Sequence, residues 1–357
     1  FPSPVRAQTV VSVSTAPGLE SAVRGANSSG GNVIIRVAAG TYDLSDTLYV
    51  NAPRVTITGA DGDRSRVVIR GDAMSASARV KSLIRVAAPN FELSSLTLER
   101  AGWHLLQVVG ESDADGAVVR NVVFRDAFQQ MLKVSIDSGR PAITADNGIV
   151  EDSVFEYTAG RGPQYYIGGI DAHGAKGWTV RRNVFRDIAS PSGSIAEFAI
   201  HFWNGSANNL VERNVIIDCD RGIGFGLDGR PNSGGVIRNN FVSHSGSGDP
   251  FANVGIALIE SPGSKVLHNT VILNHSLPWG IEYRFPSTRD AVIANNLSNK
   301  PVLARDGATG TLQANVTNAQ SSMFVDAARG DLHLAQRSAS VVDAAVPTSP
   351  VTDTDID

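Results

Sequence analysis

The sequence predicts an all-β solenoid, because two short patterns return along the chain at a nearly regular interval. The first pattern is a tetrapeptide with apolar residues at positions one and three. Its six copies are Leu132–Ser135, Ile170–His173, Ile200–Trp203, Ile223–Gly226, Ile256–Ile259 and Ile281–Arg284. Strict alternation predicts a strand that buries one face and turns the other outward. If the copies stack as neighbouring strands, their outward positions form two columns of side chains.

The second pattern resembles V-x-N-x-V-F and lies between the copies of the first. Its third positions are Ser95, Asn121, Asp152, Arg182, Arg213, Asn239, Asn269 and Asn295, which are 26 to 31 residues apart. A period of roughly 20–50 residues indicates a solenoid, and short runs without helical periodicity indicate β-coils. The longer periods place insertions at Tyr157–Gly169 and Asp187–Ala199. We expect these loops to border the outward columns, as insertions in repeat proteins often mark the binding face.

The ends of the chain predict caps. A strand over Val10–Val13 precedes a short amphipathic helix over Gly18–Ala26, which we expect to cover the open end of the core. Phe324–Asp326 and Leu332–Leu334 predict a terminal, atypical coil or cap. The predicted organisation is one domain over 1–357, with an N-terminal cap at about 10–30, coils over 31–320 and a C-terminal cap and tail over 321–357. The tail residues Asp353, Asp355 and Asp357 predict a solvated end.

Composition excludes several classes of protein. The 357 residues carry a net charge of −4, which is unlike a basic nucleic-acid-binding protein. The single cysteine, Cys219, excludes an internal disulfide and a CxxC metal site. No apolar run approaches the ~20 residues of a transmembrane helix. Because the chain begins at Phe1 without methionine, we expect a trimmed product that is secreted or periplasmic.

Several features together resemble the right-handed parallel β-helix, or pectin-lyase-like, superfamily. They are the N-terminal helix, the Ala-Ala-Gly-Thr-Tyr turn ending at Tyr42, the strand Val55–Gly59 and the Asn-rich coils that follow. The resemblance covers roughly residues 10–345 and implies a single-stranded right-handed parallel β-helix. It also implies that pairs such as Asn239-Asn240 and Asn295-Asn296 are turn positions, where side-chain amides satisfy backbone groups from coil to coil. The frequent activity of this superfamily is β-elimination on uronic-acid polysaccharides, which favours a polysaccharide-lyase-like member.

The two outward columns carry the candidate site. The first column contains Lys133, Asp171, His201, Gly224 and Glu282; the second contains His173, Trp203, Gly226 and Arg284. The glycine pair predicts a trough without side chains, walled by Glu282, Arg284 and Arg221, and the Trp203 ring predicts a platform for a sugar.

Elimination needs a base, a group that neutralises the uronate carboxylate, and an acid for the leaving oxygen. We expect His201 or Lys133 as the base, with His173 and Asp171 in the same reactive cluster. Arg284 or Arg221 is the expected neutraliser, and Tyr165 or Tyr166 in the bordering loop is the expected acid. The partner would be an acidic polysaccharide or oligosaccharide.

Other functions use the same columns. A glycoside hydrolase needs two carboxyl groups ~5–9.5 Å apart, for which Asp171 with Glu197 or Glu156 remains available. A uronate C5-epimerase and a non-catalytic glycan-binding β-helix are further alternatives, although the Asp-Pro-His-Asp motif of alginate epimerases and the calcium-binding Asp cluster of pectate lyases are missing. Asp171, His173 and His201 would alternatively hold a divalent cation such as Ca²⁺ or Zn²⁺, although a hydrogen-bonded Asp–His pair is the commoner arrangement.

Overall fold

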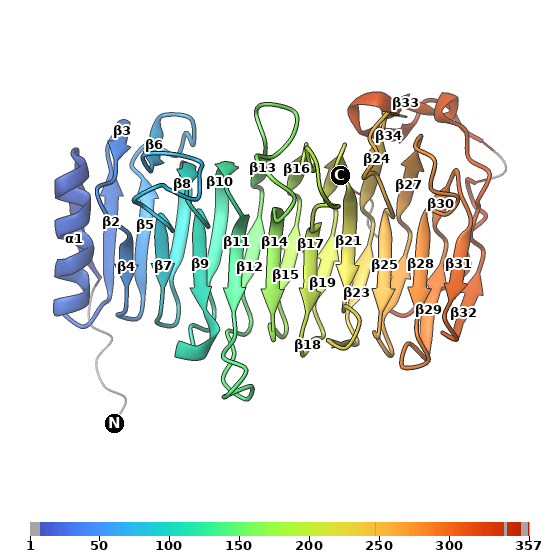
Figure 1. The fold of residues 1–357 in the computed structure, drawn as a ribbon, viewed down its shortest axis with the longest axis horizontal. Helices are drawn as coiled ribbons and strands as arrows, with labels where there is room; N and C mark the ends of the chain where they lie inside the picture. Colours follow the sequence, from blue (N-terminus) through green and yellow to red (C-terminus); the bar gives the residue numbers. More distant parts are fainter. Residues whose placement is uncertain (1–7, 247, 339–340, 351–355, 357) are drawn as a thin grey trace.

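The fold is a right-handed parallel β-helix, seen here in a computed structural model that describes residues 8–246, 248–338, 341–350 and 356. The strands stack side by side along one axis, with the N-terminal helix at one end (Figure 1). The acidic tail residues Asp353, Asp355 and Asp357 lie outside the described residues.

One face of the β-helix is a ten-stranded parallel sheet, which we call the front sheet. It consists of β4 (Leu48–Val50), β7 (Ile84–Val86), β9 (Leu106–Val109), β11 (Gln130–Ser135), β14 (Gly168–His173), β17 (Phe198–Trp203), β21 (Arg221–Phe225), β25 (Ile256–Ile259), β28 (Ile281–Arg284) and β31 (Val302–Arg305). All six tetrapeptides of the sequence pattern are in it, in register: Leu132, Ile170, Ile200, Ile223, Ile256 and Ile281 are successive partners. The predicted stacking is therefore confirmed.

The other faces form a larger sheet, which we call the back sheet, with two series of strands. The first series is β1 (Thr9–Val13), β2 (Val33–Val37), β5 (Val55–Gly59), β8 (Glu92–Ala101), β10 (Val118–Ala127), β12 (Ile149–Glu151), β15 (Thr179–Arg181), β19 (Leu210–Glu212), β23 (Val236–Arg238), β26 (Lys265–Leu267), β29 (Ala291–Ala294) and β32 (Gly310–Gln313). The second is β3 (Gly40–Asp43), β6 (Val67–Arg70), β13 (Val154–Glu156), β16 (Val184–Arg186), β20 (Val215–Ile217), β24 (Phe241–His244), β27 (Thr270–Leu273) and β30 (Leu297–Ser298). The long strands β8 and β10 belong to both series.

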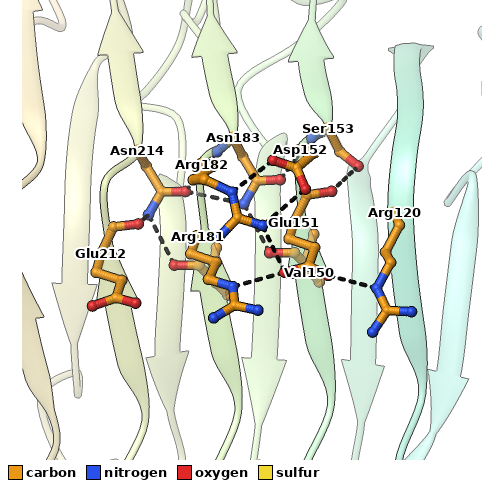
Figure 2. Close-up of polar contacts among 11 residues, drawn as sticks. Arg120, Val150, Glu151, Asp152, Ser153, Arg181, Arg182, Asn183, Glu212 and Asn214 are labelled. Carbon is orange, nitrogen blue, oxygen red and sulfur yellow. Dashed lines mark hydrogen bonds and ion pairs between the residues drawn. The ribbon is translucent and has the colours of Figure 1, made fainter. Parts of the chain in front are cut away.

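An asparagine ladder lines the corner between these two series. Asn183 accepts a hydrogen bond from the Ser153 backbone N–H, and Asn214 accepts one from the Asn183 N–H (Figure 2). The ladder continues through Asn240, Asn269, Asn296 and Asn315. The expected coil-to-coil role of the asparagines is therefore confirmed, and it satisfies backbone groups that the turn leaves without a strand partner.

The residue before each ladder position adopts a left-handed conformation. Asp152, Arg182 and Arg213 have φ values of 55°, 54° and 56°. His268, with a φ of 55°, occupies this place in its coil, because Leu267 pairs with Arg238 and Ala294. The predicted alignment, which put Asn269 there, was therefore wrong by one residue. A histidine instead of an asparagine at the left-handed position hid the correct register.

The core is filled from both sheets. Phe124, Phe155 and Phe185 stack in successive coils, with ring centroids 4.4 and 4.6 Å apart. Helix α1 (Ala16–Ser28) buries Leu19, Val23 and Ala26 against the first coil, and the Thr15 hydroxyl accepts a hydrogen bond from the Gly18 N–H as an N-cap. The expected helical cap is confirmed.

The C-terminal segment differs from the expectation of a terminal coil or cap. The strands β33 (Phe324–Asp326) and β34 (Asp331–Leu334) form an antiparallel hairpin. Phe324 and Leu332 pack with Phe241 and Ile272, so the hairpin covers the side of β24 and β27 rather than the open end. Short elements complete the chain: β18 (Ser206–Ala207), β22 (Asn232–Ser233), η1 (Gly110–Ser112), η2 (Ser321–Met323) and η3 (Ala327–Arg329).

Candidate active site

The front sheet brings the predicted columns together. Lys133 pairs with Asp171, and Asp171 pairs with His201, in neighbouring strands β11, β14 and β17. His173 pairs with Trp203 in the second column. Both columns lie on the outer side of the sheet, because the residues between them fill the core.

Lys133, Asp171 and His173 form a close polar cluster. The Lys133 Nζ donates to Asp171 Oδ2 at 2.5 Å and lies 2.7 Å from His173 Nε2. The His173 Nε2 is also 3.5 Å from Asp171 Oδ1. Asp171 is buried, whereas the side chains of Lys133 and His173 keep 13% and 14% of their surface exposed. Asp171 therefore lies beneath Lys133 and His173, and the side chains of these two residues reach solvent.

Electrostatics set the charge of two members of this cluster, Asp171 and His173. Burial alone would raise the pKa of Asp171, but the contact with His173 and the charge of Lys133 outweigh it and hold that pKa well below its ordinary value. Burial lowers the pKa of His173, and the neighbouring Lys133 charge adds to this effect. At neutral pH Asp171 is thus a carboxylate and His173 a neutral imidazole.

Trp203 and Asn204 hold this cluster in place. The Trp203 indole N–H donates to Asp171 Oδ1 at 2.6 Å, and Asn204 Nδ2 lies 3.1 Å from His173 Nδ1. The Trp203 ring stacks on His201, with the Arg230 guanidinium 5.1 Å from the Trp203 ring centroid. The expectation that Trp203 is a sugar platform is therefore not met: the ring is buried between protein groups.

His201 is also a buried supporting residue. Its Nε2 donates to the Gly226 carbonyl at 3.0 Å, and its Nδ1 faces Glu197 Oε2 at 3.3 Å, at an angle outside hydrogen-bond geometry. Burial would raise the pKa of Glu197, but His201 and Arg221 lower it, so Glu197 is a carboxylate. Because His201 is fully buried, a substrate cannot reach its ring nitrogens, and its expected role as the base is not supported.

The predicted glycine trough is filled. The Phe198 ring covers Gly224 so closely that a Cβ there would approach the ring to 2.7 Å. Gly226 has a φ of 79°, and a Cβ would meet the Ile259 carbonyl oxygen at 1.7 Å. Both glycines therefore allow close packing, and neither presents an open surface to a ligand.

Three arginines and three aromatic rings line a pocket of about 430 Å³ over β21, β25 and β28. Arg221 lies over the Phe198 ring, with the guanidinium 4.3 Å from the ring centroid. Arg305 donates to Glu282 at 2.7 Å and lies over Trp279, while Arg284 pairs with Asp306 at 2.7 Å. The walls predicted from Glu282, Arg284 and Arg221 therefore exist, together with Trp279, Phe285 and Arg305, which the sequence did not indicate.

This arginine pocket is separate from the Lys133 cluster. Arg284 on β28 is five strands from Lys133 on β11, or about 24 Å along the sheet. Arg221 on β21 is three strands, or about 14 Å, from Lys133. Arg284 therefore cannot act on the same sugar unit as Lys133, contrary to its expected role as neutraliser. The pocket is better placed to hold a neighbouring part of a long ligand.

The loop tyrosines lie at the edge of the face. Tyr165 and Tyr166 are exposed in the turn before β14, and neither hydroxyl has a hydrogen-bond partner within the described part of the chain. Tyr166 precedes β14, and the five residues from it to Asp171 span at most roughly 16 Å of backbone. Their expected role as the acid therefore has no support from proximity.

Arg230 and His104 belong to the site although no sequence pattern marked them. Arg230 is exposed beside Trp203 and has no ion pair with any residue that the structure describes. His104 Nδ1 is 2.8 Å from the Gln130 carbonyl oxygen, and burial lowers the pKa of His104 to about 4, to which the Lys133 charge contributes. Both follow irregular turns, where the alternation of strand residues gives no signal.

The expected cation site is not assembled. Across the described ranges, no three His, Cys, Asp or Glu side chains are arranged to hold a metal ion. The Lys133 ammonium occupies the space between Asp171 and His173, and His201 turns to Glu197 and Gly226. These donors therefore do not fit Ca²⁺ or Zn²⁺ in this arrangement.

Comparisons with known proteins agree with the architecture. Pectate lyase Pel9A aligns with a TM-score of 0.59 at 12% identity, covering 98% of this chain and 94% of the lyase. A mannuronic acid specific polysaccharide family 6 lyase from human gut microbiota aligns with a TM-score of 0.53 at 14% identity, covering 90% of each chain. At such identities these similarities establish the fold. No curated protein matches the sequence significantly.

No helix in the described residues is both long and apolar enough to span a bilayer. The sequence profile of the family described as "Right handed beta helix region" matches residues 90–315. The chain therefore belongs to the right-handed β-helix family.

Proposed function

We propose that this protein is a polysaccharide lyase that cleaves a uronic-acid-containing polymer by β-elimination. The observation that carries the proposal is the Lys133–His173 pair, held by Asp171 at the solvent edge of the front sheet. The β-helix architecture shared with two lyases is consistent with it. We also propose that the protein is secreted or periplasmic, where it would meet a polymeric substrate.

Lys133 and His173 supply the base. Because burial keeps His173 neutral, the pair carries one ionising proton, which moves between Nζ and Nε2 across 2.7 Å. Asp171 faces both nitrogens and stabilises the positive charge on either. When the proton is on His173, the Lys133 amine has a free lone pair and can remove the proton alpha to the uronate carboxylate.

Arg230 supplies the neutralising charge. Its guanidinium lies beside Trp203, and the Trp203 and His173 rings are 4.2 Å apart, so the free cation borders the base. A bidentate guanidinium–carboxylate pair lowers the cost of the carbanion that forms next to the carboxylate. The electron pair then forms the new double bond, the glycosidic carbon–oxygen bond breaks, and the leaving oxygen takes a proton from the Lys133–His173 pair.

Hydrolysis fits the same residues less well. A glycosidase needs two free carboxyl groups, one of them protonated. Asp171 is engaged by Lys133 and Trp203, and Glu197 is engaged by His201 and Arg221, with both pKa values lowered. Neither carboxyl is therefore available as a general acid.

The test is incubation with alginate, pectate, glucuronan and chondroitin sulfate while ultraviolet absorbance is recorded. Elimination creates an unsaturated uronate that absorbs, and the expected result is a rise that Lys133→Gln abolishes. Arg36→Gln, an exposed cation of the back sheet, is the matched control and should leave the rate unchanged. Release of reducing ends without absorbance would replace elimination by hydrolysis, and changed sugar composition without cleavage would indicate an epimerase.

A further inference from the structure

The N-terminal part of the front sheet and the turns leading into β7 and β9 carry exposed aromatic rings next to cations. Tyr49 is 44% exposed, and the Arg85 guanidinium lies 5.9 Å from its ring centroid. Trp103 is 45% exposed, and the Lys81 ammonium lies 5.9 Å from its ring centroid. Across the described residues, neither cation has an acidic partner and neither ring donates a side-chain hydrogen bond. We call these two pairs the N-terminal track.

Strand register connects this track to the reactive pair. Tyr49 pairs with Arg85, Arg85 with Gln107, and Gln107 with Lys133. β4, β7 and β9 lie between α1 and β11 along the β-helix axis (Figure 1). Tyr49 is three strands from Lys133, about 14 Å, and Arg221 of the arginine pocket is equally far on the other side.

The chemistry of the track matches one kind of ligand. Tyrosine and tryptophan present a flat apolar ring with a polar edge, which suits the face and hydroxyls of a pyranose. A cation beside each ring suits a carboxylate on the same or the next sugar. Large aromatic rings that stay exposed next to unpaired charges mark a binding surface rather than a core.

We propose that the N-terminal track binds an acidic polysaccharide chain that continues past Lys133 into the arginine pocket, so that cleavage occurs within the chain. This inference rests on the proposed function for its cleavage step, but the binding step is independent of it. A pyranose is about as long as the strand spacing, so several sugar units fit on each side of the Lys133–His173 pair. A site closed at one end would release units from a chain terminus instead.

The test compares two double variants of the whole chain, Tyr49→Ala with Arg85→Gln and Trp103→Ala with Lys81→Gln. The control is Arg36→Gln with Leu312→Ala, which removes an exposed cation and an exposed apolar side chain from the back sheet. Affinity electrophoresis through gels containing alginate, pectate, glucuronan or chondroitin sulfate measures binding without requiring activity. Each double variant should bind the retained polymer about fivefold more weakly, and the control should bind as wild type.

The cleavage step is tested on the product profile. Wild-type protein should release long oligosaccharides first, and the variants should raise KM for polymer while leaving kcat on short oligosaccharides unchanged. If the double variants lose retention by the polymer but no protein, including wild type, shows elimination, the proposed function would be overturned and binding by the N-terminal track would be supported. If elimination occurs but both double variants bind the polymer as tightly as wild type, the inference would be overturned and the lyase proposal would stand. The same holds if single sugars are the first products.

Discussion

One charged column of the back sheet and the Lys133 cluster of the front sheet present charge in opposite ways, although one repeat builds both. On the back sheet, Arg120, Glu151, Arg181 and Glu212 are successive partners in neighbouring strands (Figure 2). Arg238 is the next partner, so the charges of this column alternate in sign. On the front sheet, Lys133 and His173 share one carboxylate, and Arg230, Arg85 and Lys81 have no acidic partner within the described ranges.

The difference shows what makes a repeat surface reactive. A column of alternating charges satisfies itself and contributes to coil stacking. Charges that lack such partners, or that share one with an imidazole, remain available to a ligand. The predictions below perturb one surface at a time.

The largest expected effect is the loss of catalysis on changing Lys133. Lys133→Gln should lower kcat by about 10²–10⁴-fold, because proton transfer by a positioned group contributes that much. The amide still donates to Asp171, so thermal unfolding should change little. Steady-state kinetics on the polymer cleaved by wild type measures the effect, with Arg36→Gln as control. Unchanged kcat would remove Lys133 from the reaction.

The pH profile should show a displaced acid limb. Burial lowers the pKa of His173 below its ordinary 6.5, so the imidazole stays neutral, and the pair stays active, to a more acidic pH than free histidine allows. Below that pKa the imidazole is protonated and cannot share the proton of Lys133, so the rate should fall about tenfold per pH unit. Rates measured across the acid range decide this. A limb at or above pH 6.5 would contradict the assigned charges.

On the back sheet, the asparagine ladder should dominate stability. Asn214→Ala removes the acceptor for the Asn183 N–H and the donor to the Val180 and Glu212 carbonyls, all buried. Leaving these groups unsatisfied should cost about 2–4 kcal/mol of unfolding free energy. Urea unfolding measures it, with exposed Asn318→Ala as the control. The folded variant should be as active as wild type. A drop in its kcat would show that the back-sheet ladder affects the site on the front sheet, contrary to this account.

The charge column should contribute less. Glu151 accepts from Arg120, Arg181 and Arg182 at 2.5, 2.7 and 2.9 Å. Burial would raise the pKa of Glu151, but the contacts with Arg181 and Arg120 lower it. Glu151→Gln should therefore cost about 1–2 kcal/mol, less at high salt, because the arginines are partly exposed. Asp137→Asn, which breaks the exposed pair with Arg140, should cause no measurable loss. Equal effects of the two variants would contradict the role of the column.

A smaller pH effect on stability should come from Asp220. Burial raises the pKa of Asp220 to about 7, and nearby Asp249 adds to the shift. The native state then holds a proton that the unfolded chain releases near its ordinary 3.8, so unfolding free energy falls as pH rises between these values. Asp220→Asn should remove this dependence and stabilise the protein by about 1 kcal/mol above pH ~7. Thermal unfolding across pH measures it, and an unchanged slope would refute the assignment.

The repeat made it possible to predict the fold and which residues form the two outward columns. It did not make it possible to predict how other side chains pack over those columns. Alternation placed Lys133, Asp171 and His173 in neighbouring strands, because register follows the buried isoleucines. It could not show that Phe198 covers Gly224. Nor could it show that the Phe198 and Trp203 rings enclose His201 on the outer side of the sheet. Arg230 and Trp279 lie in turns whose conformation no pattern encodes.

The most direct test of the central claim is hydrogen exchange on Lys133→Gln with each of the four polymers. The variant binds without cleaving, so exchange reports where the chain lies. The account predicts slower exchange in loops 157–169, 187–199 and 227–231, which border the front sheet. Slower exchange only in the turns of the back sheet, with these loops unchanged, would contradict it.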